Sequence, residues 1–161
     1  MLVEIPKTPI EELKTPFLEF QKIRIFIKRD DLNDPLLMGN KFRKLKYNLI
    51  AARAKGADTL LTYGGAYSNH IFATAAAGKR YGFKTIGLIR GDELNTKSNP
   101  TLEAAANFGM TLLFLPRQEF SDFKSHLTFP SDVKGKIYTL PEGGTNRAAI
   151  RGCAEIIEEI S

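Results

Sequence analysis

The feature that most constrains the fold is a regular alternation of short apolar segments with longer helical segments from residue 58 onward. Runs rich in β-branched and apolar residues are typical of buried strands, whereas the alanine-rich and amphipathic stretches between them have helical periodicity. The predicted strands are DTLLTY (58–63), KTIGLIR (84–90), TLLFLP (111–116) and GKIYTLP (135–141). The predicted helices are HIFATAAAGKRY (70–81), NPTLEAAANF (99–108) and RAAIRGCAEIIEEI (147–160). This alternation predicts an α/β fold with a parallel sheet flanked by helices and right-handed crossovers.

The first part of the chain does not follow this rhythm. Residues 1–20 contain three prolines and predict an irregular arm with a short turn at IEEL (10–13). KIRIFIK (22–28) alternates cationic and apolar residues, which predicts a half-buried strand. Asn40 is a suitable N-cap for a basic helix over residues 41–54. These elements have no obvious sheet to join, and the last helical pattern has no stop signal. We therefore expect either a small domain with an irregular N-terminal arm or a chain from which part of a larger protein is missing.

Composition excludes several classes of protein. The 161 residues are 43% hydrophobic and 25% charged, which is typical of a soluble globular domain with a proper core. No apolar run approaches the roughly 18 residues of a membrane span, and the acids and prolines near the start do not form a secretory signal. A single cysteine, Cys153, cannot form an internal disulfide and fits a reducing compartment, so we expect a cytoplasmic protein.

Charge and metal-binding residues exclude two further classes. The net charge is +5, but acids are interleaved with the cations and no motif for stacking on bases accompanies them, so we expect no nucleic-acid partner. With two histidines and one cysteine far apart in sequence, we predict no metal site.

One lysine stands out in the basic stretch GNKFRKLK (39–46). In the predicted helix Leu45 and Leu49 belong to an apolar stripe, and Lys41 borders this stripe in the first turn, whereas Arg43 and Lys44 point away from it. The positive end of the helix dipole, the neighbouring cations and burial would all lower the pKa of the Lys41 amine. A neutral lysine amine is the nucleophile of Schiff-base chemistry. On these residues alone an ordinary surface lysine near an N-cap is the favoured interpretation, and the other cations are interpreted as a solvated face.

Two glycine turns follow predicted strands and precede predicted helices. They are YGGAYSNH (63–70) and PEGGTN (141–146), and both should lie at the carboxyl edge of the sheet, where α/β proteins bind ligands. Free N–H groups at such turns bind a carboxylate or phosphate, and Ser68, Asn69 and Thr145 add polar groups there. Alternatively, these residues only cap helices. No G-x-G-x-x-G or G-x-S-x-G pattern is present, which disfavours a dinucleotide fold and a serine triad.

Taken in order and spacing, GNKFRKL, YGGAYSNH and PEGGTN resemble the pyridoxal-phosphate enzymes of the 1-aminocyclopropane-1-carboxylate deaminase and D-cysteine desulfhydrase family. This family has the tryptophan-synthase-β-like, or type II, fold. The resemblance implies that Lys41 binds pyridoxal 5′-phosphate covalently and that Asn69 binds the ring hydroxyl oxygen of the cofactor. It also implies that Ser68, with the backbone of Asn69 and His70, receives the carboxylate of the substrate. The catalytic residues so implied are Lys41 and Ser68, and the substrate-binding residues are Ser68, Asn69, His70, Gly144 and Thr145.

The resemblance implies a domain organisation as well. Residues 1–45 would begin a large cofactor domain that carries the lysine, residues 46–145 would form a small α/β domain, and residues 146–161 would return to the large domain. The remainder of the large domain, with its phosphate loop, ring-nitrogen partner and tyrosine, would be missing. The chain alone would then be an inactive part of an enzyme that is a homodimer when full length.

The implied activity is that of a deaminase or lyase on a small amino acid, with release of ammonia and a 2-oxo acid by final hydrolysis. The deaminases proper tend to have glutamine where His70 stands and cysteine where Gly144 stands, so these two positions favour the D-cysteine desulfhydrase type. The alternative from another class is a non-catalytic α/β domain that binds an anion or nucleotide at the turns of Gly64 and Gly143.

Overall fold

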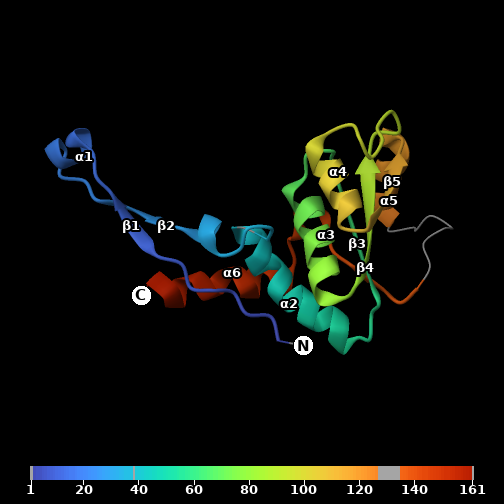
Figure 1. The fold of residues 1–161 in the computed structure, drawn as a ribbon, viewed down its shortest axis with the longest axis horizontal. Helices are drawn as coiled ribbons and strands as arrows, with labels where there is room; N and C mark the ends of the chain where they lie inside the picture. The colour runs from blue at the N-terminus through green and yellow to red at the C-terminus, as the bar shows by residue number, and fades with distance from the viewer. Residues whose placement is uncertain (1, 38, 127–134, 161) are drawn as a thin grey trace.

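The computed structural model describes residues 2–37, 39–126 and 135–160, and its centre is a four-stranded parallel sheet (Figure 1). The strands lie in the order β5-β4-β3-β6, so the first strand of the sheet in sequence, β3, is internal. Every residue of β3 is buried, as expected for a strand covered on both faces. The parallel α/β sheet predicted from the sequence is confirmed. Its strands are β3 (Thr59–Gly64), β4 (Lys84–Arg90), β5 (Met110–Leu115) and β6 (Ile137–Thr139).

Helices cover both faces of this sheet. On one face α3 and α4 pack against β4 and β5 through a cluster that includes Ile71, Ile89 and Leu102. On the other face α5 packs on β3 and β4 through Phe120 and Phe123. The sequence predicted α3 and α4 but not α5. The helix bounds are α3 (Asn69–Tyr81), α4 (Pro100–Asn107) and α5 (Arg117–His126).

The basic helix α2 (Asn40–Ala54) and the last helix α6 (Arg147–Ile160) pack against each other beside the sheet. The contact is so close that a Cβ on Gly152 would lie 2.0 Å from the carbonyl oxygen of Arg43. Both helices were predicted, but the predicted cap of α2 is wrong. Asn40 is already helical, and the N-cap is Gly39 at φ +66°, without a side-chain cap hydrogen bond. Only glycine adopts this left-handed turn at little cost.

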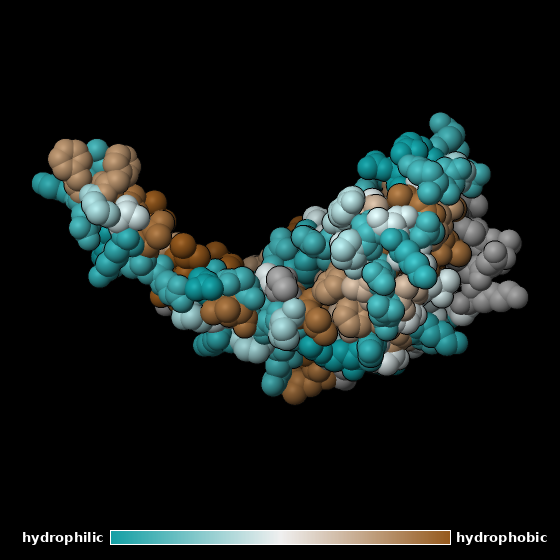
Figure 2. Space-filling view, turned by 45° about the horizontal axis from the view of Figure 1, so that its top comes forward, coloured by the Kyte–Doolittle hydropathy of each residue, from teal (hydrophilic) through white to brown (hydrophobic). Residues whose placement is uncertain are grey.

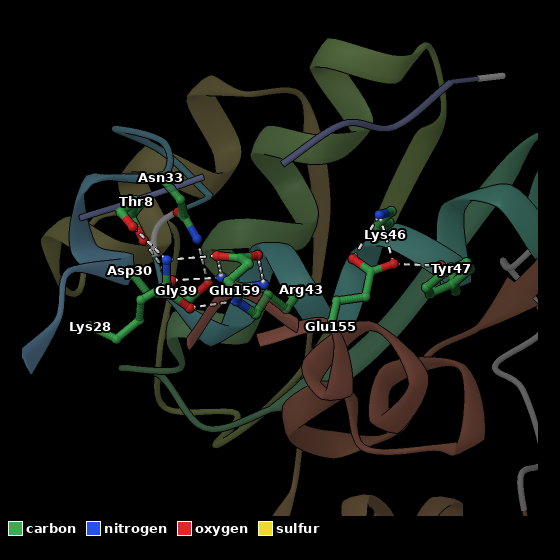
Figure 3. Close-up of polar contacts among 10 residues, drawn as sticks. All are labelled: Thr8, Lys28, Asp30, Asn33, Gly39, Arg43, Lys46, Tyr47, Glu155 and Glu159. Atoms are coloured by element: carbon green, nitrogen blue, oxygen red, sulfur yellow. Dashed lines mark hydrogen bonds and ion pairs between the residues drawn. The ribbon is translucent and has the colours of Figure 1, made fainter. Parts of the chain in front are cut away.

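The prediction that Arg43 belongs to a solvated face is also wrong. Its side chain is buried and makes two-point ion pairs with Asp30, which precedes α2, and with Glu159 on α6 (Figure 3). Lys28 also pairs with Glu159, at 2.7 Å. Lys46 is engaged too, since its ammonium pairs with Glu155 on α6. The helical wheel located the stripe of Leu45 and Leu49 but could not show that α6 supplies acids to the neighbouring positions.

The N-terminal arm projects away from the sheet (Figure 1). It consists of the antiparallel ribbon of β1 (Ile10–Leu13) and β2 (Ile25–Lys28), with the short helix α1 (Pro16–Phe20) between them. IEEL is therefore a strand and not a turn. The strand predicted within residues 22–28 is present, but its half-burial is wrong, since three of the four residues of β2 are exposed. The apolar residues of the ribbon are about half exposed, from 42% at Ile10 to 52% at Phe26 (Figure 2). No helix among the described residues is long and apolar enough to cross a membrane.

Candidate active site

A cavity of about 390 Å³ lies where the starts of α2, α3 and α4 converge. The last two helices follow β3 and β4, so the cavity lies at the carboxyl edge of the sheet, as predicted for the ligand. It brings together Lys41 and Asn69, which the sequence assigned to the cofactor from separate motifs. The lining residues are Leu36, Asn40, Lys41, Asn69, Phe72, Ala73, Pro100 and Thr101.

Lys41 has the electrostatic surroundings of a reactive amine. Burial lowers the pKa of its ammonium group from the ordinary value of 10.5, and the neighbouring charge of Lys44 lowers this pKa further. Within the described ranges no carboxylate forms an ion pair with Lys41 that would oppose these effects. The predicted lowering of the pKa of Lys41 is thus confirmed, but one of the neighbouring cations expected to cause it does not do so. Arg43 does not contribute, because its guanidinium group is turned into the ion pairs with Asp30 and Glu159.

Ser68 and Asn69 occupy the start of α3. Ser68 is the N-cap, and its Oγ accepts a hydrogen bond from the backbone N–H of Ile71 at 3.3 Å. A hydroxyl that accepts one bond still has a proton to donate, so capping does not prevent Ser68 from binding a carboxylate. Asn69, the first residue of the helix, lines the cavity, whereas Ser68 does not. Gly64 lies close to this cap, because a Cβ there would be 3.2 Å from the Oγ of Ser68.

His70 joins the two glycine turns. Its side chain is 1% exposed, and neither ring nitrogen has a hydrogen-bond partner among the described residues. The ring lies so close to Gly144 that a Cβ on this glycine would be 2.5 Å from Cε1 of His70. Burial lowers the pKa of His70 to about 3, with further contributions from Lys41 and Lys44, so the imidazole is neutral at pH 7. The prediction that both glycine turns lie at one edge is confirmed by this contact.

Lys44 and Thr145 form a contact that sequence reasoning missed. The ammonium group of Lys44 donates hydrogen bonds to the carbonyl oxygen of Gly143 at 3.0 Å and to Oγ1 of Thr145 at 2.8 Å. Lys44 therefore holds the PEGGTN turn against α2, and the hydroxyl of Thr145 faces this lysine. Thr145 lines a separate groove with Lys44, not the cavity of Lys41. Its assignment to the substrate stays a prediction.

The cavity wall contains residues that no motif indicated. Phe72 and Ala73 come from the first turns of α3, and Pro100 and Thr101 from the start of α4. The rule that the carboxyl edge gathers the turns after strands could have found Thr101, because α4 follows β4. Leu36 carries no such signal, since it lies in the irregular segment before α2.

These residues fit one part of a pyridoxal-phosphate site. A lysine with a lowered pKa and an amide on the same cavity wall suit the aldehyde and the ring oxygen of this cofactor. In the described part of the chain, the cavity wall contains no arginine or glycine that could hold the phosphate. Nor do three metal-binding side chains gather anywhere in the described ranges. Lys41 and Asn69 therefore fit the part of such a site that binds the aldehyde and the ring oxygen.

Comparison with known proteins agrees with this chemistry. The family described as "Pyridoxal-phosphate dependent enzyme" matches residues 2–161. A Thermotoga maritima protein, provisionally named a 1-aminocyclopropane-1-carboxylate deaminase, is 33% identical over 98% of this chain and 51% of its own length. A D-cysteine desulfhydrase from Serratia proteamaculans is 30% identical over 96% of this chain and 48% of its own. The crystal structure of an ACC deaminase homologue superimposes with a TM-score of 0.76 at 30% identity, over 97% of this chain and 48% of the homologue.

The lengths in these matches are as informative as the identities. Each match takes in nearly the whole of this chain but only half of the relative. The chain therefore spans about half the length of the relatives that it matches, as the sequence motifs led us to expect.

Proposed function

The chain belongs to the pyridoxal-phosphate-dependent enzyme family, and on this premise we propose that it carries the lysine half of the active site of a deaminase or desulfhydrase. Lys41 would bind the cofactor and Asn69 would bind the ring oxygen. The observation that supports this proposal most strongly is the shared cavity, in which a lysine with a lowered pKa lies beside that amide. The division into residues 1–45, 46–145 and 146–161, a homodimer and a cytoplasmic location stay predictions.

The substrate that we propose is a small amino acid, released as ammonia and a 2-oxo acid. The named activities of two relatives, on 1-aminocyclopropane-1-carboxylate and on D-cysteine, define the two candidates. His70 and Gly144 are in direct contact, so the two positions that distinguish the candidates in sequence act as one unit. We favour the D-cysteine type because this pair has the desulfhydrase-like identity at both positions.

In this proposal, different residues of the chain would act as the base and bind the substrate carboxylate. Pyridoxal phosphate, when bound, supplies an aldehyde for the amino group and a ring that stabilises negative charge at Cα. The amine of Lys41 would be the base that takes the Cα proton, and the lowering of its pKa favours the neutral form that this role needs. The first N–H groups of α3, at Asn69 and His70, and the Ser68 hydroxyl would orient the substrate carboxylate. Leu36 and Phe72 would contribute the apolar part of the cavity wall.

The cofactor and the substrate need separate experiments. Titration of the chain with pyridoxal phosphate should give a visible absorption band that borohydride removes, and Lys41→Ala should not give this band. An equal band in Lys41→Ala would refute the role of Lys41.

For the substrate, the chain completed with the missing half should release pyruvate from D-cysteine faster than 2-oxobutyrate from 1-aminocyclopropane-1-carboxylate. The reverse order would assign the deaminase type, and neither product would favour a non-catalytic anion-binding domain.

A further inference from the structure

A second cavity, of about 570 Å³, lies at the carboxyl edge of the sheet. It is formed by the turn after β3, the end of β4 and one side of α5. Because α5 packs on the face of the sheet opposite to α3 and α4, this second cavity and the cavity of Lys41 lie on different faces. Its volume is within the roughly 300–1,000 Å³ of small-molecule sites. Its wall includes Gly65, Ala66, Arg90, Leu94, Phe120 and Ser121.

The turn YGGAYSNH (63–70) borders both cavities. Asn69 lines the cavity of Lys41, whereas Gly65 and Ala66 line the second cavity. The carbonyl oxygen of Ala66 accepts a hydrogen bond from the side chain of Asn99 at 3.2 Å, which connects the turn to the N-cap of α4. A ligand in the second cavity would therefore contact the back of the turn for which we propose binding of the substrate carboxylate.

Arg90 is the cation of this wall that has no acidic partner. In the part of the chain that the structure describes, it forms no ion pair, and its guanidinium group lies 6.0 Å from the centroid of the Phe120 ring. A Cβ on Gly65 would be 3.8 Å from Nη2 of Arg90, so the guanidinium group also lies beside the turn. The N–H donors of a guanidinium group form a planar fork that matches the two oxygens of a carboxylate.

The other charges of the wall are already balanced. Arg117 pairs with Glu93 at 2.6 Å, and Lys124 pairs with Glu142 at 2.7 Å. Asp92 acts electrostatically on Arg117 as a further acid nearby. The second cavity therefore has a single guanidinium group without a counter-charge. One such group suits the single charge of a carboxylate better than the two charges of a phosphate.

The rest of the wall suits the organic part of such a ligand. Ala66, Leu94 and Phe120 contribute apolar surface, and Ser121 contributes a hydroxyl group. Sites for small molecules combine apolar surface with a few polar groups that fix the orientation of the ligand. The wall of the second cavity combines both kinds of group around Arg90.

We propose that the second cavity is a further ligand site, in which Arg90 binds the carboxylate of a small organic monocarboxylate and Leu94 and Phe120 contact its apolar part. A 2-oxo acid, the class of product in the proposed reaction, is a molecule of this kind. The site does not depend on the proposed function, because the two cavities share no wall residue.

Propionate is a suitable probe, because it has one carboxylate and a short apolar tail but no carbonyl group that could react with Lys41. The 161-residue chain is titrated with sodium propionate at constant ionic strength, and the amide NMR signals of Gly65, Leu94 and Ser121 are followed. We expect saturable shifts of these signals. In Arg90→Gln the dissociation constant should rise at least tenfold, because the side chain loses its charge and its fork of donors.

Two comparisons give the titration its specificity. Arg151→Gln is the matched control, since Arg151 also lies over an aromatic ring, that of Tyr47 at 4.1 Å, but belongs to α6. This variant should leave the dissociation constant of propionate unchanged. Inorganic phosphate, at the same ionic strength, should bind to the unaltered chain at least tenfold more weakly than propionate.

Equal dissociation constants in the unaltered chain and in Arg90→Gln would overturn the proposal, as would equal shifts with sodium chloride alone. Phosphate that binds as tightly as propionate would contradict the assignment to a monocarboxylate. Shifts confined to the signals of Phe72 and Thr101 would place propionate in the cavity of Lys41 and would also overturn the proposal. No cofactor is present in these measurements, so their result is independent of the pyridoxal-phosphate titration that tests Lys41.

Discussion

Lys41 and Lys44 lie almost one helical turn apart on α2, and their functions differ because their partners differ. Lys44 donates hydrogen bonds to the PEGGTN turn, whereas Lys41 lines the cavity. The fixed ammonium of Lys44 then acts on Lys41 as a nearby positive charge and lowers the pKa of its amine. One lysine thus positions a turn and tunes the other.

This arrangement predicts the pH dependence of Lys41. Because burial and Lys44 favour the neutral amine, the reductive methylation of Lys41 should have a pH midpoint below 10.5. Lys44→Gln removes one of the two causes and should move this midpoint upward, but burial should keep it below 10.5. Lys46→Gln removes a charge from the same helix and serves as the control with no effect. Methylation rates of the Lys41 peptide, followed by mass spectrometry, test this, and a midpoint at or above 10.5 in the unaltered chain would contradict it.

The neighbouring glycines 143 and 144 predict a matched pair of stability effects. Both have positive φ, +67° and +72°, so alanine at either position should cost about 1–2 kcal/mol of backbone strain. A Cβ on Gly143 would meet nothing within 4 Å, whereas one on Gly144 would collide with His70. Gly144→Ala should therefore lower the free energy of unfolding by at least about 1 kcal/mol more than Gly143→Ala does.

Urea unfolding of the two variants measures this difference. His70→Ala in the Gly144→Ala background should recover part of the loss, which identifies the collision as its cause. Equal losses at positions 143 and 144 would show that the ring of His70 does not limit this turn.

Some properties of individual residues could be predicted from the sequence, and others could not. The edge of the sheet at which Lys41 and Asn69 lie was predictable, because the turns after parallel strands gather at the carboxyl edge. The roles of these two residues toward the cofactor were implied by the resemblance and stay predictions. The burial of Arg43 was not, since its acid partners Asp30 and Glu159 are 13 and 116 residues away. A helical wheel includes only neighbours within the helix, so it assigned this arginine to solvent.

At the scale of elements, the cluster around Arg43 joins three segments that are far apart in sequence. Arg43 on α2 binds Asp30 from the segment after β2 and Glu159 from α6 (Figure 3). Its guanidinium group is almost fully buried, so the loss of one partner leaves uncompensated charge. This cluster thus connects the segment after β2 and the end of α6 to α2.

The cluster predicts a loss of stability in acid. Hydrogen bonds from Arg43 and Lys28 lower the pKa of Glu159 from 4.5 to about 2, and Arg43 also lowers the pKa of Asp30. A carboxylate with a lower pKa in the folded state stabilises the fold fully above its unfolded pKa. The free energy of unfolding should thus fall as the pH decreases from about 5 to 2, with a smaller decrease in Arg43→Met.

Arg43→Met should itself cost about 3 kcal/mol or more at pH 7, measured by urea unfolding, because it removes one partner of a buried ion pair. Arg24→Met is the matched control, since Arg24 pairs with Glu12 at the exposed surface and such pairs contribute little. If the two variants lose similar stability, the buried cluster does not hold these elements.

Two elements, α5 and β1, were not predicted from the sequence because their local patterns are weak. α5 (Arg117–His126) has only Phe120 and Phe123 as its buried apolar residues, which is too weak a periodicity to detect in ten residues. β1 was interpreted as a turn because IEEL is short and acidic. Its partner strand β2 is separated from it by residues 14–24, so the pairing gives no local signal. By contrast, β3 and β4 are apolar and closely bounded, so local pattern was sufficient for them.

At the scale of the whole molecule, the chain spans about half the length of the relatives that it matches. Lys41 and Asn69 line one cavity, and among the described residues the wall of this cavity includes no glycine or arginine. The proposed role of Lys41 in binding the cofactor therefore has to be tested on this lysine itself.

The central claim is that Lys41 is the amine that binds the cofactor, and one measurement tests it most directly. The chain is treated with less than one equivalent of pyridoxal phosphate, reduced with borohydride and digested, and the pyridoxyl label is located by mass spectrometry. We predict that most of the label lies on the peptide that contains Lys41. A label distributed over the exposed lysines in proportion to their exposure, with no excess at Lys41, would contradict the account.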